Sequence, residues 1–195
     1  ITTAAIYTVT ATNSSGSVNF ALNIIVNDSP PTSLSYAGAP FVFTKGVTIT
    51  SVSPTVTGTP TSYSVSPALP SGLAINTTTG VLAGTPSVVA ANTVYTVTAT
   101  NSGGSTTFNM NLAVNDTPPS ALSYATNPFI FGTGTAISIS PTITGTPISY
   151  SVSPALPTGL GINTVTGILS GTPTVLTVSG NYTVTATNSG GSTTF

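Results

Sequence analysis

Histidine, cysteine and tryptophan are absent from the chain, and only three of its 195 residues carry a charged side chain: Asp28, Lys45 and Asp116. General acids, general bases and activated nucleophiles are mostly built from His, Cys, Lys, Asp or Glu side chains in mutual contact. The two aspartates occupy equivalent positions in different sequence repeats, so they form no carboxylate pair within one domain. The composition predicts a protein that is not an enzyme and has no catalytic residues.

The shortage of charged and metal-binding side chains also argues against cofactors and nucleic-acid partners. Zinc, iron and copper sites need imidazole or thiolate ligands, which this chain lacks. Nucleic-acid binding needs several Lys or Arg side chains against phosphate, and the chain has one cation. No apolar run approaches the roughly 20 residues that span a bilayer. We expect no cofactor, no nucleic-acid partner and no membrane span in these residues.

Low charge does not make this chain disordered. Charged residues make up 2% of it and hydrophobic residues 39%, whereas disordered chains combine low hydrophobicity with high net charge. The first ten residues lack the basic flank and apolar stretch of a signal peptide. We interpret the sequence as an internal piece of a longer folded array.

One domain-sized unit is repeated along the chain. Residues 63–73 read YSVSPALPSGL and residues 150–160 read YSVSPALPTGL, and the run YTVTATN begins at Tyr7, Tyr95 and Tyr182. The period of 87 to 88 residues is too long for a solenoid and suits a small β-sandwich. The matching runs NDSPP and NDTPP predict boundaries, because paired prolines cannot continue a strand ladder. Three parts follow: a partial repeat at 1–28, a complete repeat at 29–116, and a repeat at 117–195 that lacks most of its last strand.

Alternating apolar and polar residues predict an all-β fold. From Phe108 to Val114, and again from Tyr95 to Ala99, every second residue is apolar, as in a strand with one buried side. The turn formers at 101–104 between these two segments predict a hairpin. No segment has an apolar stripe of helical period. Further strands are expected at residues 33–36, 41–43, 47–52, 62–65, 73–75 and 81–83.

The two longer repeats differ in length by one residue. Seven residues separate Gly46 from Pro54, whereas six separate Gly134 from Pro141. A β-bulge near Thr50 and the following serine would absorb the extra residue.

Several spaced motifs recur in the same order in both longer repeats. They are Leu69 to Leu73, Ile75 with Asn76, Thr79 to Pro86, Tyr95 to Asn101 and Gly103 with Gly104, and again Leu156 to Leu160, Thr166 to Pro173 and Tyr182 to Asn188. Nearly the whole chain thereby resembles the immunoglobulin-like repeats of large bacterial surface proteins, which are related to cadherin-like domains of the dystroglycan type. The resemblance implies tandem Ig-like β-sandwiches, without catalysis, outside a bacterial cell or on its surface.

The surface of such sandwiches would be polar but nearly uncharged, because the outward strand positions are Thr, Ser and Asn. Strand edges without Lys or Glu are prone to pair with neighbouring chains. Our leading hypothesis is a structural element of a filament, sheath or stalk whose partners are copies of itself. Two alternatives stay open: a spacer arm that presents an adhesin's binding domain, and an accessory module of a secreted carbohydrate-active enzyme.

Calcium is where the sequence departs from the related cadherins. Calcium takes six to eight oxygen ligands with several carboxylates among them, but each junction here offers one Asp, Asp28 or Asp116, beside one Asn. These two residues are weak calcium candidates, and a capped turn before the prolines is the favoured interpretation. An isopeptide crosslink at Lys45 is also disfavoured, because Thr133 replaces it in the next repeat and the chain has no Glu.

Surface glycans are another candidate partner. All seven Tyr and seven Phe residues fall at repeat-equivalent positions, which favours core residues over sugar-binding platforms. Asn-x-Ser/Thr sequons begin at Asn13, Asn27, Asn76, Asn115 and Asn181, and such motifs arise readily by chance in a chain this rich in Thr and Asn.

A more specific form of the assembly hypothesis is that one segment of the chain acts as a donor strand. The partial repeat contains the strand segment that the third repeat lacks, with Ala21, Leu22, Ile24 and Val26 as the candidate donor residues. These residues could complete the sandwich of another molecule by β-strand addition. The sequence favours a uniform array cut at arbitrary points, because residues 1–20 duplicate strands already present at 176–195.

Overall fold

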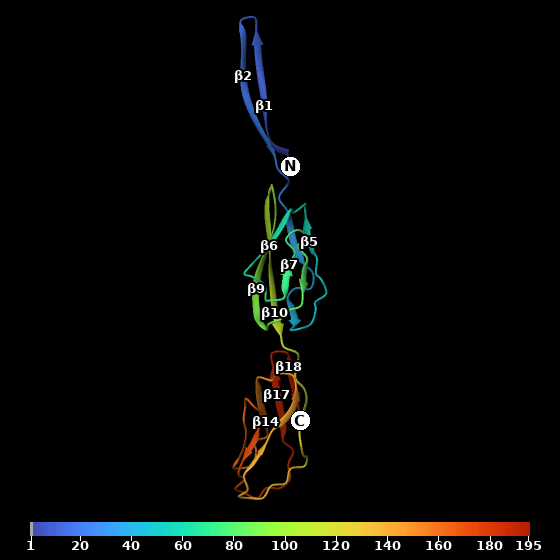
Figure 1. Ribbon diagram of the computed structural model, residues 1–195, viewed down its shortest axis with the longest axis vertical. Helices are drawn as coiled ribbons and strands as arrows, with labels where there is room; N and C mark the ends of the chain where they lie inside the picture. Colours follow the sequence, from blue (N-terminus) through green and yellow to red (C-terminus); the bar gives the residue numbers. More distant parts are fainter. Residues whose placement is uncertain (1) are drawn as a thin grey trace. The chain divides into compact units, whose positions relative to one another are not determined.

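The computed structural model describes residues 2–195, with side chains described from residue 5, and every regular element among them is a β-strand (Figure 1). This confirms the all-β fold class. Alternation of Thr, Val and Ile suits a pleated, half-buried surface and explains why strands form. The chain divides into two compact units, of which the first extends to Ala113 and the second spans Val114–Phe195.

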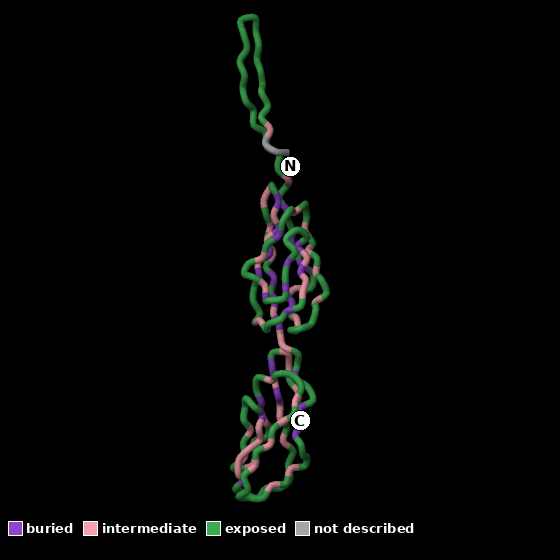
Figure 2. Tube along the Cα trace, viewed as in Figure 1, coloured by how far each residue is buried: buried purple, intermediate pink, exposed green. Residues whose placement is uncertain are grey.

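The first unit begins with a long hairpin of β1 (Thr2–Asn13) and β2 (Gly16–Val26). The strands pair antiparallel, and the register shifts between Thr2 and Ala5, so the end of β2 nearest Val26 has the least regular pairing. All of β2 is exposed, although many of its side chains are apolar (Figure 2).

The middle repeat follows the hairpin and has eight strands in three sheets. The strands are β3 (Thr32–Tyr36), β4 (Phe41–Thr44), β5 (Pro54–Thr57), β6 (Ser62–Ser66), β7 (Leu73–Ile75), β8 (Leu82–Gly84), β9 (Ala90–Asn101) and β10 (Gly104–Asn115). The largest sheet has the order β4-β10-β9-β6, and β3-β5 and β7-β8 form two-stranded sheets.

The core of the middle repeat joins these sheets. Val97, Met110 and Leu112 on the large sheet and Leu82 on β8 are 0% exposed. The ring of Tyr36 on β3 lies 5.8 Å from that of Phe108 on β10. Side chains from separate sheets thus pack into one interior, as in a β-sandwich.

The third repeat has the same plan with a smaller large sheet. Its strands are β11 (Ser120–Tyr124), β12 (Ile137–Ile139), β13 (Pro141–Thr144), β14 (Ser149–Ser153), β15 (Leu160–Ile162), β16 (Leu169–Gly171), β17 (Thr183–Asn188) and β18 (Gly191–Thr194). The sheets are β14-β17-β18, β12-β16-β15 and β11-β13. The buried cluster consists of Leu122, Tyr124, Tyr150 and Ala186.

Most of the strands expected from the sequence are present, but one expectation is wrong. No strand forms over 47–52, where a hydrogen bond from Ile49 N to Gly84 O and a bridge between Val52 and Leu82 take its place. The strand β5 was not expected, because its first residue is Pro54; proline is tolerated at that position of a strand.

The predicted β-bulge is confirmed by these same contacts. In the third repeat Ile137 pairs with Gly171 and Ile139 with Leu169, two residues apart on each side. In the middle repeat the corresponding hydrogen bonds join Ile49 N to Gly84 O and Val52 N to Leu82 O. Three positions separate the first residues and two separate the second, so one extra residue lies between Ile49 and Val52. That residue disrupts the ladder locally, which explains why 47–52 is not a regular strand.

Buried tyrosines make the folded state sensitive to high pH. The Tyr36 hydroxyl donates a 2.6 Å hydrogen bond to Gly80 O. Burial, and to a smaller extent the charge of Tyr63, raises the pKa of Tyr36 to about 12, against about 10 for tyrosine in an unfolded chain. Folding therefore favours the neutral phenol, and its stabilising effect is complete below about pH 10 and is lost as the pH rises from about 10 to 12.

We expect the melting temperature to fall over that alkaline interval and the substitution Tyr36→Phe to flatten the fall. Tyr36→Phe should also lower stability at neutral pH by about 1 kcal/mol, because Gly80 O loses its partner. Calorimetry as a function of pH on both proteins measures the effect. An identical alkaline slope in the two proteins would show that the Tyr36 phenol does not cause it.

Candidate functional site: an open groove in the third repeat

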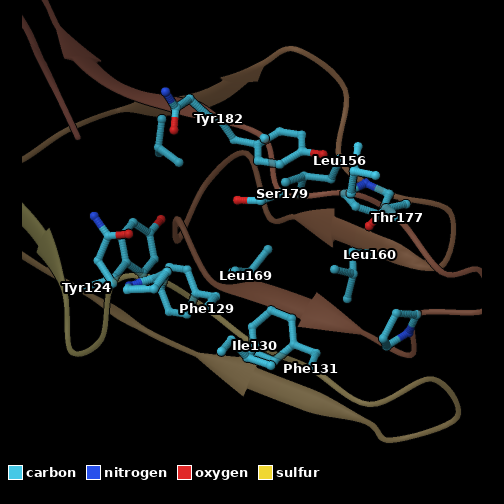
Figure 3. Close-up of a pocket in the computed structure, with 18 of the residues that line it drawn as sticks. Tyr124, Phe129, Ile130, Phe131, Leu156, Leu160, Leu169, Thr177, Ser179 and Tyr182 are labelled. Carbon is cyan, nitrogen blue, oxygen red and sulfur yellow. The ribbon is translucent and has the colours of Figure 1, made fainter.

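The third repeat contains a groove of about 780 Å³. Apolar side chains line it, among them Phe129, Leu160, Ile162, Leu169, Tyr182 and Val184. Figure 3 shows Phe129 and Phe131 on one side, Tyr182 and Thr177 on the other, and Leu169 between them.

These six lining residues correspond to buried core residues of the middle repeat. In the same order, their counterparts are Phe41, Leu73, Ile75, Leu82, Tyr95 and Val97, all of which are buried. In the third repeat all six are partly exposed. Residues Leu122, Tyr150 and Ala186, which do not line the groove, stay buried as their counterparts do. The groove is therefore a local opening of an otherwise equivalent core.

The opening lies where the middle repeat places the second half of β10. Met110, Leu112 and Val114 on that half are 0% exposed, and residues 117–195 contain no counterpart of them, because Phe195 corresponds to Phe108. Residues 129–132 and 177–182, the counterparts of β4 and of the first half of β9, form no strand.

The lining of the groove is electrically neutral. No charged side chain lines it, and its polar side chains are hydroxyls and amides, such as those of Thr177, Ser179 and Asn181. Its walls at 129–132 and 177–182 form no strand. The lining contains no arrangement of nucleophile and base.

A second constellation holds the linker that precedes the middle repeat. The side chain of Asn101, at the end of β9, is buried; its amide donates to Ser29 O at 2.8 Å, and its carbonyl accepts from Gly103 N at 2.9 Å. The backbone N–H of Asp28 donates to Ser102 Oγ at 2.9 Å. A Cβ on Gly103 would lie 1.8 Å from Asp28 O. We call residues 101–103 and the linker they hold the linker clamp.

The third repeat builds the same clamp from the counterpart residues. Asn188 donates to Thr117 O at 2.8 Å, and Asp116 N donates to Ser189 Oγ at 2.9 Å. A Cβ on Gly190 would lie 1.9 Å from Asp116 O. Sequence reasoning interpreted these glycines only as turn formers; the signal that they do more is that both turns read Asn-Ser-Gly-Gly, whereas the β1–β2 turn reads Asn-Ser-Ser-Gly.

The comparison with known families now decides the identity of the fold. The family described as Putative Ig domain matches residues 23–115 and 111–195. The chain belongs to this family. Its two Ig domains cover more than half of the sequence, in agreement with the resemblance drawn from the repeated motifs.

Solved Ig-domain structures share the fold. An I-band fragment of titin superposes with a TM-score of 0.50 at 19% identity, with 98% of this chain and 72% of that chain covered. The N-terminal four Ig domains of Dscam1 isoform 9.44 give a TM-score of 0.50 at 16% identity, over 87% of this chain and 45% of that chain. A search of curated proteins found no match. At these identities the likeness concerns the Ig fold alone.

The residues singled out from the sequence lie in different parts of these Ig domains. Asp28 and Asp116, the weak calcium candidates, belong to the two clamps, and Asp28 Oδ2 accepts a hydrogen bond from Ser102 Oγ at 3.0 Å. No group of three His, Cys, Asp or Glu side chains that could hold a metal occurs within residues 2–195. The donor candidates Ala21, Leu22, Ile24 and Val26 all lie exposed on β2. Residues 2–195 also contain no helix long and apolar enough to cross a membrane.

Proposed function

We propose that this chain is a non-catalytic structural array of Ig domains from a bacterial extracellular filament, sheath or surface stalk. The observation that carries the proposal is the linker clamp, which occurs in both Ig domains with the same partners. Restrained linkers suit an array that spaces or supports other parts of a protein.

The clamps leave few unrestrained residues in the connections. β2 ends at Val26, and Asp28 is already held by Ser102. β10 ends at Asn115, and the next residue, Asp116, is held by Ser189. Short restrained linkers limit the conformational freedom of a chain more than long flexible ones do. This property supports a structural role.

The edges of the large sheets support assembly between copies. β6 and β14 are edge strands of their sheets, and Ser64 and Ser151 at their centres are exposed. Neither strand carries the Lys, Glu or Pro residues with which edges are usually protected against pairing. The chain has a net charge of −1, so long-range repulsion between copies is weak.

We expect the double substitution Ser64→Lys and Ser151→Lys to weaken lateral association, because each copy would bring a positive charge to an edge that is neutral in the native chain. Light scattering at several protein concentrations, with electron microscopy of the same samples, measures the effect. The double substitution to Asn is the matched control, since it changes size and polarity without adding charge. Equal association of the Lys and Asn variants would contradict assembly through these edges.

Calcium and the alternative roles are tested with the same samples. A filament that needs calcium would dissociate when the ion is removed, whereas the clamps predict no change. Dispersed monomeric rods at every concentration would instead favour a spacer arm of an adhesin or a module of a secreted enzyme.

A further inference from the structure

The linker that enters the middle repeat is bound on two sides. On one side lies the linker clamp, in which Asp28 N donates to Ser102 Oγ at 2.9 Å and Ser102 Oγ donates to Asp28 Oδ2 at 3.0 Å. On the other side Pro31 is buried, and a Cβ on Gly58, directly after β5, would lie 3.3 Å from Pro31 Cα. Residues 28–31 are thus held between two separate turns of the repeat.

The third repeat holds its own linker in the same way. The amide of Asn188 donates to Thr117 O at 2.8 Å and to Thr146 O at 3.4 Å. Both distances equal those that the amide of Asn101 makes in the middle repeat. Pro119, at the end of this linker, is buried. Because two repeats build the same contacts independently, the held linker is a property of the repeat and not of one copy.

The clamp is joined directly to the strand by which the chain leaves the middle repeat. Residues 101–103 form the turn between β9 and β10, and β10 continues from there to Asn115. The β9–β10 hairpin runs along the length of this repeat (Figure 1). A tension applied before Asp28 can therefore reach Asn115 through the hydrogen bonds of the clamp and the covalent backbone of one strand. Residues 32–100 lie outside that route.

The other route for tension runs through β3 and is weaker. β3 pairs with β5 alone, and the register shifts between Thr32 and Ser35. Within this shift Ser33 has a φ of 56°, a left-handed conformation that is unfavourable for a residue with a Cβ. Ala121 has a φ of 54° at the matching shift in the third repeat. The first strand of each of these repeats is therefore irregular at the end where tension would arrive.

We propose that this array bears tension along its chain, and that the linker clamp passes the tension from the linker into β10, so that the rest of the middle repeat is spared. Three hydrogen bonds join Asp28 and Ser29 to Asn101 and Ser102. Tension loads them together, because they connect two consecutive linker residues to two consecutive turn residues. The inference rests on the proposed structural function and adds a mechanical task to it.

The first test compares two points of loading. The chain contains no cysteine, so introduced cysteines can place optical-tweezers handles at chosen residues of the full chain. Asn27→Cys with Asn115→Cys sends the tension through the clamp, whereas Thr32→Cys with Asn115→Cys admits it after the clamp. Asn27 and Thr32 are both exposed.

At the same constant force, we expect the middle repeat to stay folded at least about tenfold longer when the handle is at residue 27. The reason is that three hydrogen bonds contribute more free energy than a tenfold change requires. Equal lifetimes with the two handle positions would overturn the inference.

The second test separates the tension route from ordinary stability. Ser102→Ala removes the hydroxyl that binds Asp28, so it should bring the ratio of the two lifetimes close to one. Leu82→Ala is the matched control, because it weakens the core far from the clamp; it should shorten both lifetimes and leave their ratio unchanged. Circular dichroism checks that both variants are folded. A Ser102→Ala chain that keeps the native ratio would contradict the tension route, whatever its stability.

Failure of this inference can be told apart from failure of the proposed function. Equal lifetimes, combined with self-association that the Ser64→Lys and Ser151→Lys variant weakens, would overturn the tension route and leave the assembled array intact. Lifetimes that differ as expected, in a chain that is monomeric at every concentration, would support the tension route and contradict assembly between copies.

Discussion

Replacing Gly103 by Ala should release the linker that precedes the middle repeat. The new Cβ would lie 1.8 Å from Asp28 O and 3.0 Å from Pro30 N, both of which are backbone atoms. The linker must therefore move, and the hydrogen bonds from Asn101 to Ser29 O and from Asp28 N to Ser102 are weakened or lost. We expect the middle repeat to lose about 1–3 kcal/mol of unfolding free energy, the usual cost of forcing an extra carbon into a packed site.

Limited proteolysis and hydrogen exchange measure this release. Cleavage at residues 28–31 should become faster in Gly103→Ala, as should amide exchange at Asp28. Gly161→Ala is the matched control, because nothing lies within 4 Å of a Cβ there and the counterpart residue in the middle repeat is Ala74. If Gly103→Ala were as stable and as resistant to cleavage as this control, the clamp would not restrain the linker.

Leu82→Ala and Leu169→Ala should differ in cost although the two residues are counterparts. Leu82 is 0% exposed, and truncating a fully buried leucine costs about 2–5 kcal/mol. Leu169 lines the groove and is partly exposed. Its removal enlarges a space that is already open, so we expect a cost of about 1 kcal/mol or less.

Hydrogen exchange followed by mass spectrometry resolves the two repeats and gives an opening free energy for each. A further comparison uses a variant in which the sequence of residues 109–116 is appended after Phe195 as a counterpart of the second half of β10. In that chain the groove is filled, so the cost of Leu169→Ala should rise toward that of Leu82→Ala. Equal costs in the native chain would show that the groove is closed in solution.

Local patterns in the sequence were sufficient for much of the fold. Period-two alternation predicted β9 and β10, since burial of Val97 and Met110 follows directly from it. Aligning the two repeats predicted the bulge, because a one-residue insertion between aligned residues has few other solutions in a strand. The strand expected over 47–52 was wrong for the same reason: alternation was present, but the bulge interrupted its pairing.

Features that depend on distant contacts were not predicted. The clamp joins Asn101 to Ser29 across 72 residues, and nothing in the local sequence of either segment identifies the other. The asparagine was interpreted as a turn residue, although its side chain is buried and has three backbone partners. The sequence also could not show that residues 129–132 and 177–182 would form no strand although their counterparts in the middle repeat do.

The hairpin turns of this array have similar sequences but differ in whether they can hold a linker. Ser15 stands in the β1–β2 turn at the position of Gly103 and Gly190, where a Cβ would lie 1.8 Å and 1.9 Å from the carbonyl oxygen of an aspartate. The Cβ of Ser15 therefore prevents a linker from packing against the β1–β2 turn as Asp28 and Asp116 pack against the other two turns. The modules are consequently not freely interchangeable: a recombination event that copied the first hairpin into a later position would preserve the domain and lose its anchorage.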